Sequence, residues 1–401
     1  MLRTTAQTYR NAFSGLSRST WLLSLIMLIN RSGTMVVPFM TLYLTSPKMG
    51  YSIGQAGFVF GLFGLGAFSG SWMGGRLTDR FGFFPIQLIS LTGGGILFFA
   101  LGQMHSFGMI CLFTYLLSFV NEAFRPANST AIAFYSKEEN RTRSYALNRL
   151  AINLGWAAGS ALGGIIAHHN YELLFWVDGS TNLLAAGIML IAFKPLNFNK
   201  PKSVSKVKEK AKSAYQDKVY LAFVLTAVLF ASCFFQLFTN IPVFFRYHLN
   251  LSEPVIGSLM AMNGLIIAAG EMVLVYKLEG KRPATYYIPI GVGLVSLAYF
   301  SLTLPIPGMI LGPLMIIIVT FGESMSMPFM NSFWISRTTH ENRGQYAALY
   351  SMAWSVAQSL GPIAGSQVAE HFGFRVLWAV GGALTLISAL AFRRVHKHRN
   401  K

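Results

Sequence analysis

Four charged side chains lie near the centres of long apolar stretches of this sequence, namely Arg31, Glu122, Arg125 and Glu323. A charge at the centre of a hydrocarbon layer costs about 2.5 to 3.5 kcal/mol on insertion scales, so each of them should face a cavity or an opposite charge. A carboxylate in such a place can bind and release protons, and an arginine can bind an anionic group. The 8 histidines fall in loops or at helix ends, so a proton relay at mid-depth should use carboxylates.

The two glutamates differ in their local surroundings. Glu122 and Arg125 are three residues apart, so they share a helix face and can partly neutralise each other. Glu323 has no basic residue within one helical turn of the sequence. We take Glu323 as the first candidate for proton coupling and Glu122 as the second. The alternatives are a static salt bridge for Glu122 and a hydrogen bond to a neighbouring helix for Glu323. Arg31 either binds an anionic substrate group or pairs with one of the glutamates.

The composition indicates that membrane-spanning helices carry these residues. Hydrophobic residues make up 53% and charged residues 11% of the chain, whereas soluble domains carry about 25% charged residues. The apolar stretches are each near the ~20 residues that cross a hydrocarbon core of about 30 Å. We predict an all-α membrane protein with twelve transmembrane helices, over residues 21–43, 53–75, 85–104, 109–135, 145–167, 173–193, 220–246, 254–276, 285–304, 309–335, 346–368 and 376–392.

The distribution of basic residues predicts the orientation. Only Lys48, Arg246 and Arg375 lie on loops that follow odd-numbered spans. Two more, Arg31 and Arg125, lie near the centres of spans, and the other 27 of the 32 Lys and Arg lie on the termini, on the remaining loops or near the span ends beside them. Basic loops stay in the cytoplasm, so both termini should be cytoplasmic. Contact with anionic lipids explains the net charge of +18, and we expect membrane lipids but no nucleic acid as partners.

The second half of the chain repeats the first. The pattern that begins at Glu122 recurs from Glu323, and from Pro126 onward the offset is a constant 202 residues. Such a repeat in an apolar chain is typical of a transporter with two pseudo-symmetric bundles. We therefore predict a six-helix bundle over residues 1–195, a basic cytoplasmic linker over 196–218 and a second six-helix bundle over 219–401.

The segment GRLTDRFG, over residues 75–82, carries a family resemblance. It is similar to the signature loop G-x-x-x-D-R-x-G-R-R of the major facilitator superfamily, with Phe83 and Phe84 in place of the last two arginines. The resemblance covers the whole chain, because the span number, the duplication and the basic central linker agree with it. It implies the fold of that superfamily and a central path lined by the first, fourth, seventh and tenth helices, which carry all four buried charges.

The same segment predicts a cytoplasmic gate. A carboxylate here can reach the positive N-terminal end of a neighbouring helix, and an arginine can hold helix-end carbonyls. The alternative is a solvated pair on an ordinary loop. The residues assigned to the gate are Gly75, Asp79, Arg80 and Gly82, with Glu271 of the eighth helix as a candidate to complete it.

Glycines in the fifth and eleventh spans predict close helix crossings. Small residues three and four positions apart let two helices approach and rock, although they are also common in general membrane packing. The fifth-span pattern resembles the glycine-rich motif of antiporters, with Ser160 where that motif has proline. The predicted packing hinge consists of Gly155, Gly159, Gly163, Gly361, Pro362 and Gly365.

The helices that the resemblance places around the path also hold amides and aromatic rings. Such a lining suits amphipathic organic molecules, because stacking and apolar contacts tolerate varied shapes. The alternative is that most of the rings face lipid or other helices. Besides Arg31 and Arg125, the predicted substrate cavity contains Asn30, Asn121, Gln236, Phe238, Asn240, Asn331 and Trp334.

These observations predict a proton-coupled secondary active transporter that works by alternating access. The Gly322-Glu323 pair resembles the Gly-Glu pair of drug/proton antiporters, which favours export of amphipathic small molecules in exchange for protons. Tyr115 stands near the position of the fourth-helix arginine of that branch, so proton-coupled uptake of a peptide, organic acid or sugar is the alternative. No nucleophile motif, His-carboxylate cluster or metal-ligand set is present, so we expect no enzyme activity, cofactor or metal. We expect a monomer in a bacterial inner membrane.

Overall fold

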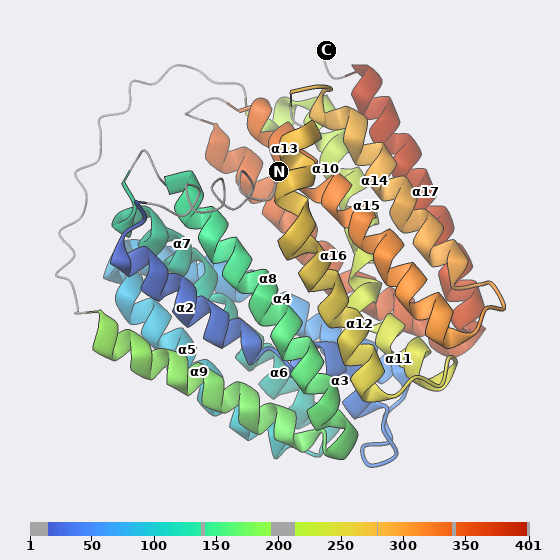
Figure 1. Ribbon diagram of the computed structural model, residues 1–401, viewed down its shortest axis with the longest axis horizontal. Coiled ribbons are helices and arrows are strands. Elements are labelled where there is room, and N and C mark those ends of the chain that lie inside the picture. Colours follow the sequence, from blue (N-terminus) through green and yellow to red (C-terminus); the bar gives the residue numbers. More distant parts are fainter. Residues whose placement is uncertain (1–14, 138–140, 194–212, 279, 339–341, 399–401) are drawn as a thin grey trace, which may run out of the picture. The chain divides into compact units, whose positions relative to one another are not determined.

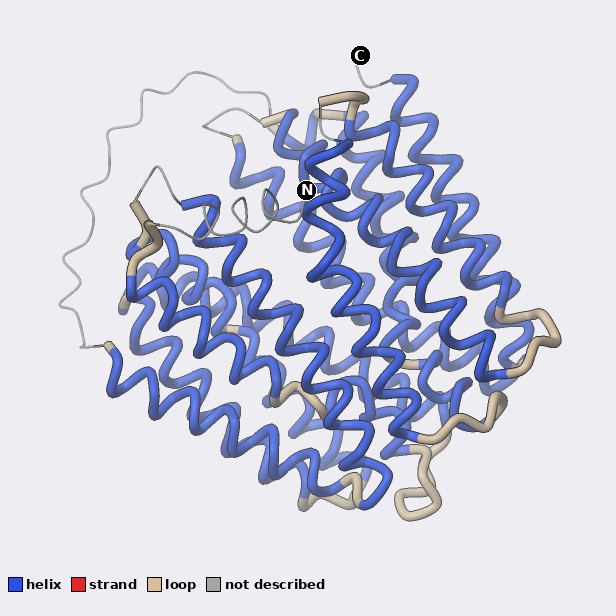
Figure 2. Tube along the Cα trace, viewed as in Figure 1, coloured by secondary structure: helices blue, strands red, loops and turns tan. Residues whose placement is uncertain are grey.

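The computed structural model describes residues 15–137, 141–193, 213–278, 280–338 and 342–398. Within these ranges almost every residue is helical and there is no β-strand, as Figure 2 shows. The predicted linker over 196–218 lies mostly outside the described residues, which resume at Ser213. There a 3-10 turn, η2 (Ala214–Gln216), leads directly into the next long helix.

Eleven described helical segments are long and apolar enough to span a membrane. The segment that corresponds to the predicted eleventh span, α16 (Arg343–Phe372), is as long as the others but is not among the eleven. It carries several polar residues, including Gln358, Ser359 and Ser366, which lowers its mean hydropathy. The eleven segments and α16 together correspond to the twelve predicted spans, so the all-helical fold is confirmed. The cytoplasmic placement of the termini stays a prediction.

The chain packs into two compact units, Met1–Val36 with Gly66–Lys200, and Val37–Leu65 with Pro201–Lys401. The predicted bundles 1–195 and 219–401 follow the sequence repeat, and their bounds stay a prediction. Residues 37–65 of the predicted first bundle belong to the second packing unit. The first part of α4 (Ile53–Phe81) belongs to the second unit, where it packs closely on α16. A Cβ atom on Gly57 would lie 2.3 Å from the Ser366 side chain.

In the first unit, α5 packs along α9, and α2 packs along α8 (Figure 1). Its core contains Leu23, Ile26, Phe83 and Phe124, all nearly inaccessible to solvent. The helices of this unit, with the second part of α4, are α2 (Arg18–Ser32), α5 (Phe83–Gly102), α6 (Phe107–Glu122), α7 (Phe124–Tyr135), α8 (Arg141–His169) and α9 (Glu172–Ala192).

In the second unit, α14 packs along α17, and α10 packs along α16, which repeats the pairing in the first unit. This is the packing that a duplicated sequence predicts. The other helices of the unit are α3 (Val36–Leu44), α10 (Lys218–Phe234), η3 (Phe235–Phe238), α11 (Asn240–Tyr247), α12 (Glu253–Ile266), η4 (Ile267–Glu271), α13 (Met272–Leu278), α14 (Ala284–Ser301), α15 (Gly308–Ser336) and α17 (Phe374–His398).

Several predicted spans are interrupted within their length. The first breaks between α2 and α3, the fourth at Ala123, and the seventh at the 3-10 turn η3. The eighth contains a π-helical turn, η4, which ends at Glu271. Periodicity alone predicted continuous helices at these places, and the side chains that stabilise the breaks come from distant parts of the chain.

Candidate functional site

A cavity of about 340 Å³ opens in the first unit beside α2, α7 and α8. Two arginines and several amide and hydroxyl groups line it, so it is both cationic and rich in hydrogen-bonding groups. The predicted residues Arg31 and Arg125 lie together in this cavity. Its lining is Met27, Arg31, Arg125, Asn128, Ser129, Ile132, Tyr145, Asn148 and Ile152.

The predicted charges of the first unit form one electrostatic group. Nη2 of Arg125 lies 3.0 Å from Oε2 of Glu122, and the Glu122 side chain is only 9% exposed. Arg31 interacts electrostatically with both residues. Its Nε atom is buried and finds no hydrogen-bond partner among the described residues. Because Arg31 and Arg125 both line the cavity, it presents positive charge to a ligand.

A break in the fourth span positions Glu122. Pro126 has no N–H group, so it cannot donate to the carbonyl of Glu122 four residues earlier. The hydroxyl of Ser71 on α4 donates to that carbonyl instead, over 3.2 Å. The chain can therefore end α6 at Glu122 and restart α7 at Phe124 without leaving this carbonyl unsatisfied.

The sequence analysis missed a chain of buried amides at this cavity. Nε2 of Gln87 donates to Asn128 over 3.2 Å, and Nδ2 of Asn128 donates to Asn148 over 3.2 Å. Tyr145 donates to the carbonyl of Ser129 over 2.9 Å. The available signal was the presence of amides inside apolar spans close to Arg125.

Two predicted cavity residues of the first unit do not line this cavity. Asn30 donates to Asn182 on α9 over 3.0 Å. Asn121 packs closely against Gly94 on α5, since a Cβ atom on Gly94 would lie only 2.8 Å from Oδ1 of Asn121. Both amides therefore lie at helix contacts within the first unit.

Asp178 is fully buried and stabilises the break in the first span. Its carboxylate accepts hydrogen bonds from the backbone N–H groups of Met35, over 2.9 and 3.0 Å, and Val36, over 2.8 Å. These groups stand at the start of α3, where helix N–H groups have no partner within the helix. The sequence analysis gave Asp178 no such role.

In the second unit, Glu323 lies partly buried on α15 and contacts α12. Nδ2 of Asn263 donates to Oε2 of Glu323 over 3.3 Å and to Oγ1 of Thr320 over 2.9 Å. The π-helical turn that follows Asn263 ends at the buried Glu271. Single π-helical turns inside α-helices are frequent at functional sites. The hydrogen bond to a neighbouring helix that we considered for Glu323 is thus present.

Gln236 and Asn240 connect the break in the seventh span to α16. Nε2 of Gln236 donates to the carbonyl of Gly361 over 2.8 Å, and its Oε1 accepts from Asn240 over 2.6 Å. Oδ1 of Asn240 in turn accepts from Ser366 over 3.2 Å. Both amides are buried in these contacts, so they hold η3 and α11 against α16.

Aromatic rings gather on α10, η3 and α16 of the second unit. The ring of Phe234 lies 5.6 Å from that of Phe238 and 6.2 Å from that of Trp354, which in turn lies 6.2 Å from Tyr350. The predicted Trp334 extends the group, 6.1 Å from Tyr350, and donates to the exposed Asn331 over 3.2 Å. We call Phe230, Phe234, Phe235, Phe238, Trp334, Tyr350 and Trp354 the aromatic cluster.

Comparisons with known proteins identify the family. Residues 20–357 and 314–401 match the model of the Major Facilitator Superfamily. The chain belongs to the major facilitator superfamily. This major facilitator is therefore an integral, multi-pass membrane transport protein of a family whose substrates are small molecules.

Its relatives differ in what they carry. This major facilitator is 24% identical over 405 residues to a Na(+), Li(+), K(+)/H(+) antiporter of Planococcus maritimus, across 91% of this chain and 92% of that protein. It is 20% identical over 372 residues to the quinolone resistance protein NorA of Staphylococcus aureus strain MRSA252, across 92% and 94% of the two chains. A solved POT family transporter in complex with 5-aminolevulinic acid superposes with a TM-score of 0.78 at 14% identity, across 94% and 96% of the chains. That likeness shows the fold.

The family signature lies on a helix and not on a loop. Helix α4 continues to Phe81, so Gly75 and the exposed Asp79 and Arg80 lie on its last turns. The chain then reverses at Gly82, whose φ of 88° favours glycine. The next residue, Phe83, is 1% exposed in the core of the first unit. Phe83, which replaces an arginine of the family motif, therefore makes an apolar core contact where the motif has a charged side chain.

The glycine-rich spans of this major facilitator do form close crossings. A Cβ atom on Gly155 would lie 2.8 Å from the carbonyl oxygen of Leu28, and one on Gly159 would lie 2.8 Å from that of Ser32. In the second unit a Cβ atom on Gly361 would lie 2.5 Å from the carbonyl oxygen of Ser232. The other predicted hinge residues are placed on the same two helices, with Gly163 buried on α8 and both Pro362 and Gly365 on α16.

Proposed function

We propose that this protein is a proton-coupled antiporter of a bacterial cytoplasmic membrane that exports amphipathic small molecules by alternating access. The observation that carries the proposal is the contact between Glu323 on α15 and Asn263 on α12. A carboxylate accepts the amide N–H in a charge-assisted hydrogen bond, which is about twice as strong as a neutral one. Protonation of Glu323 removes that charge, so binding of a proton weakens one contact between two helices.

Two groups of side chains, each described within its own unit, suit the parts of an amphipathic substrate. The second unit supplies the aromatic cluster, and aromatic rings bind apolar groups of varied shape. The first unit supplies two guanidinium groups and the amides of Asn128 and Asn148 in a cavity of about 340 Å³, which suits a polar or anionic group. One relative is named as a cation/proton antiporter, which supports proton antiport, and another is named as a quinolone resistance protein, which supports an organic substrate.

The cavity of the first unit favours a second candidate function. Its two arginines and its amides also suit a small zwitterionic or anionic nutrient, which a proton-driven symporter would take up. The two candidates predict opposite proton movements. In an antiporter the proton and the substrate move in opposite directions, and in a symporter they move together.

Flux into proteoliposomes tests the proposal. The purified protein is reconstituted, a pH gradient is imposed, and amphipathic dyes, dipeptides, nucleosides, organic acids, Na⁺ and K⁺ are supplied in turn while a trapped indicator reports internal pH. We expect dyes to move against the proton flow. Proton flow in the same direction as a nutrient would support the symporter, and no gradient-dependent flux for any compound would contradict both candidates.

The variant Glu323→Gln tests the coupling residue. Glutamine accepts the Asn263 hydrogen bond but cannot take a proton, so gradient-driven accumulation should fall to the level of empty liposomes while substrate counterflow persists. Glu172→Gln, the same change in the first turn of α9, should retain accumulation. Active transport by Glu323→Gln at the wild-type rate would show that Glu323 is not the coupling residue.

A further inference from the structure

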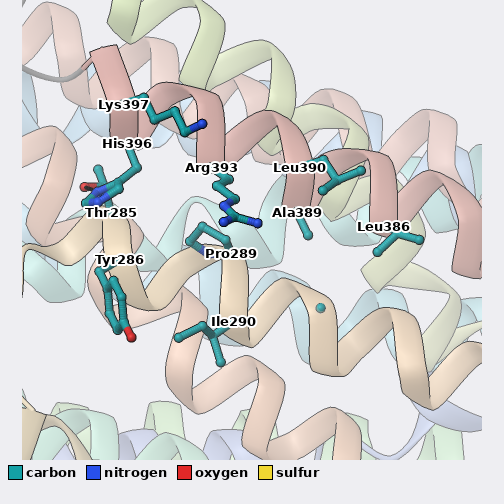
Figure 3. A pocket seen from close by; sticks show the side chains of 11 residues that line it. Thr285, Tyr286, Pro289, Ile290, Leu386, Ala389, Leu390, Arg393, His396 and Lys397 are labelled. Atoms are coloured by element: carbon teal, nitrogen blue, oxygen red, sulfur yellow. Dashed lines mark hydrogen bonds between the residues drawn. The ribbon is translucent and has the colours of Figure 1, made fainter.

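A groove of about 670 Å³ runs between α14 and α17 of the second unit. Figure 3 shows that one end of the groove is apolar and the other is basic. Leu386 and Leu390 from α17 and Ile290 from α14 lie along the apolar part, and each is at least 41% exposed. No acidic residue lines the groove.

The basic end is built from one face of α17. Arg393, His396 and Lys397 are spaced three and four residues apart, so their side chains emerge on the same face of the helix. Nδ1 of His396 lies 2.6 Å from the hydroxyl of Thr285 on α14, which fixes the imidazole ring at the groove. Neither α14 nor α17 contains an Asp or Glu that could neutralise these groups. This end of the groove therefore carries the charge that an anion would need.

The length of the groove matches one leaflet of a membrane. From Leu386 to Lys397 the helix rises 1.5 Å per residue, which places the basic end roughly 16 Å from the apolar end. One leaflet contributes about half of a hydrocarbon core of about 30 Å. An acyl chain that lies along Leu386, Leu390 and Ile290 would thus bring a lipid headgroup to the level of Arg393 and Lys397.

We propose that this groove binds an anionic phospholipid. The lipid phosphate lies between Arg393 and Lys397 beside His396, and an acyl chain fills the groove over Gly293. Basic pockets between transmembrane helices are suited to anionic headgroups. A free anion would use only the basic end, whereas a zwitterionic lipid would gain less from the two cations.

Lipid titration of the purified full-length protein, followed by native mass spectrometry, tests this proposal. Dioleoyl-phosphatidylglycerol should bind more tightly than dioleoyl-phosphatidylcholine. Removal of both cations in Arg393→Gln/Lys397→Gln should weaken phosphatidylglycerol binding about 25-fold, at about fivefold for each charge. The matched control is Lys218→Gln/Arg394→Gln, which removes two cations from a neighbouring groove on another face of α17 and should change this binding little.

A second variant tests the apolar part without changing any charge. A Cβ atom on Gly293 would meet no atom within 4 Å, so Gly293→Phe can place its ring in the groove without displacing the backbone. It should weaken binding of phosphatidylglycerol and leave binding of inorganic phosphate unchanged.

Three outcomes would overturn the proposal. Equal affinity for the two lipids would remove the role of the headgroup charge. Equal losses in the two double variants would indicate general surface charge. Displacement of the lipid by millimolar inorganic phosphate, with no effect of Gly293→Phe on lipid binding, would indicate a site for a free anion.

Discussion

Replacement of Asp217 by alanine should destabilise the second unit by about 4 kcal/mol. Asp217 is the N-cap of α10, where its Oδ1 accepts from the N–H of Tyr220 over 3.0 Å. Its carboxylate also accepts from Nε and Nη2 of Arg337 over 2.7 and 2.8 Å, and from the Tyr346 hydroxyl over 3.0 Å. The Arg337 and Asp217 side chains are only 18% and 13% exposed. The same groups thus connect the start of α10, the end of α15 and the start of α16.

The magnitude follows from the two roles of this carboxylate. Loss of an N-cap costs about 1 kcal/mol. Removal of one partner of a fully buried ion pair costs about 3 to 5 kcal/mol, because the other charge stays buried without compensation. This pair is partly buried, so its loss should lie near the lower limit, and the cap loss adds to it. One side chain has both roles, so the total loss of stability in Asp217→Ala should lie near the middle of the range of about 3 to 5 kcal/mol. Asp217→Asn keeps a good N-cap and should recover roughly the first of the two contributions.

The pH dependence of this contribution has a definite sign. Partial burial raises the pKa of Asp217, but the hydrogen bonds from Arg337, Tyr220 and Tyr346 outweigh it, and the pKa lies below its usual value. An unfolded Asp has a pKa of about 3.9. The stabilisation is therefore fully present above that unfolded pKa and is lost as the pH falls through the lower folded pKa. Asp217→Asn should lack this acid-dependent loss.

Unfolding by denaturant in mixed micelles measures these free energies. The matched set is wild type, Asp217→Ala, Arg337→Ala and the double variant. The double variant should be more stable than the sum of the single losses predicts, by up to about 3 kcal/mol, because the two side chains share one interaction. Strict additivity, or a loss below about 1 kcal/mol in Asp217→Ala, would refute the reasoning.

The other predictions concern helix contacts and are measured as melting temperatures in detergent. Gly361→Ala should destabilise the protein by about 1 to 3 kcal/mol because its Cβ atom would lie 2.5 Å from the Ser232 oxygen, whereas Gly381→Ala, with nothing within 4 Å, should be neutral or stabilising; equal effects would contradict the close crossing. Asp178→Ala leaves the N–H groups of Met35 and Val36 without their acceptor and should cost about 1 to 3 kcal/mol for each. Asp178→Asn retains one acceptor oxygen and should lose less, and an equal loss would argue against the capping role.

Local patterns in the sequence were enough to predict some of the site. The three-residue spacing of Glu122 and Arg125 predicts a shared helix face, and the two side chains form an ion pair at 3.0 Å. The three- and four-residue spacing of small residues predicts close crossings, which are present at Gly155 and Gly361. Both predictions succeed because they depend on helical geometry, which neighbouring residues determine.

Predictions about which residues share a cavity succeeded less well. Asn30 and Asn121 lie at helix contacts, and Gln236 and Asn240 bind to α16 and to each other. An amide in an apolar span must find a hydrogen-bond partner, but its spacing does not say whether that partner is a ligand or another helix.

The sequence by itself determined the medium, the apolar spans and the repeat. These depend on composition, on the length of each apolar stretch and on the offset of 202 residues. Only the tertiary structure decided that Ser71 bonds to the carbonyl of Glu122, that Asp178 stabilises the break before α3, and that α14 and α17 form a groove with one basic end. The physical reason is that each of these features joins residues at least 51 positions apart. Helical periodicity shows which side chains share a face of one helix, but only the tertiary packing determines which other helix that face contacts.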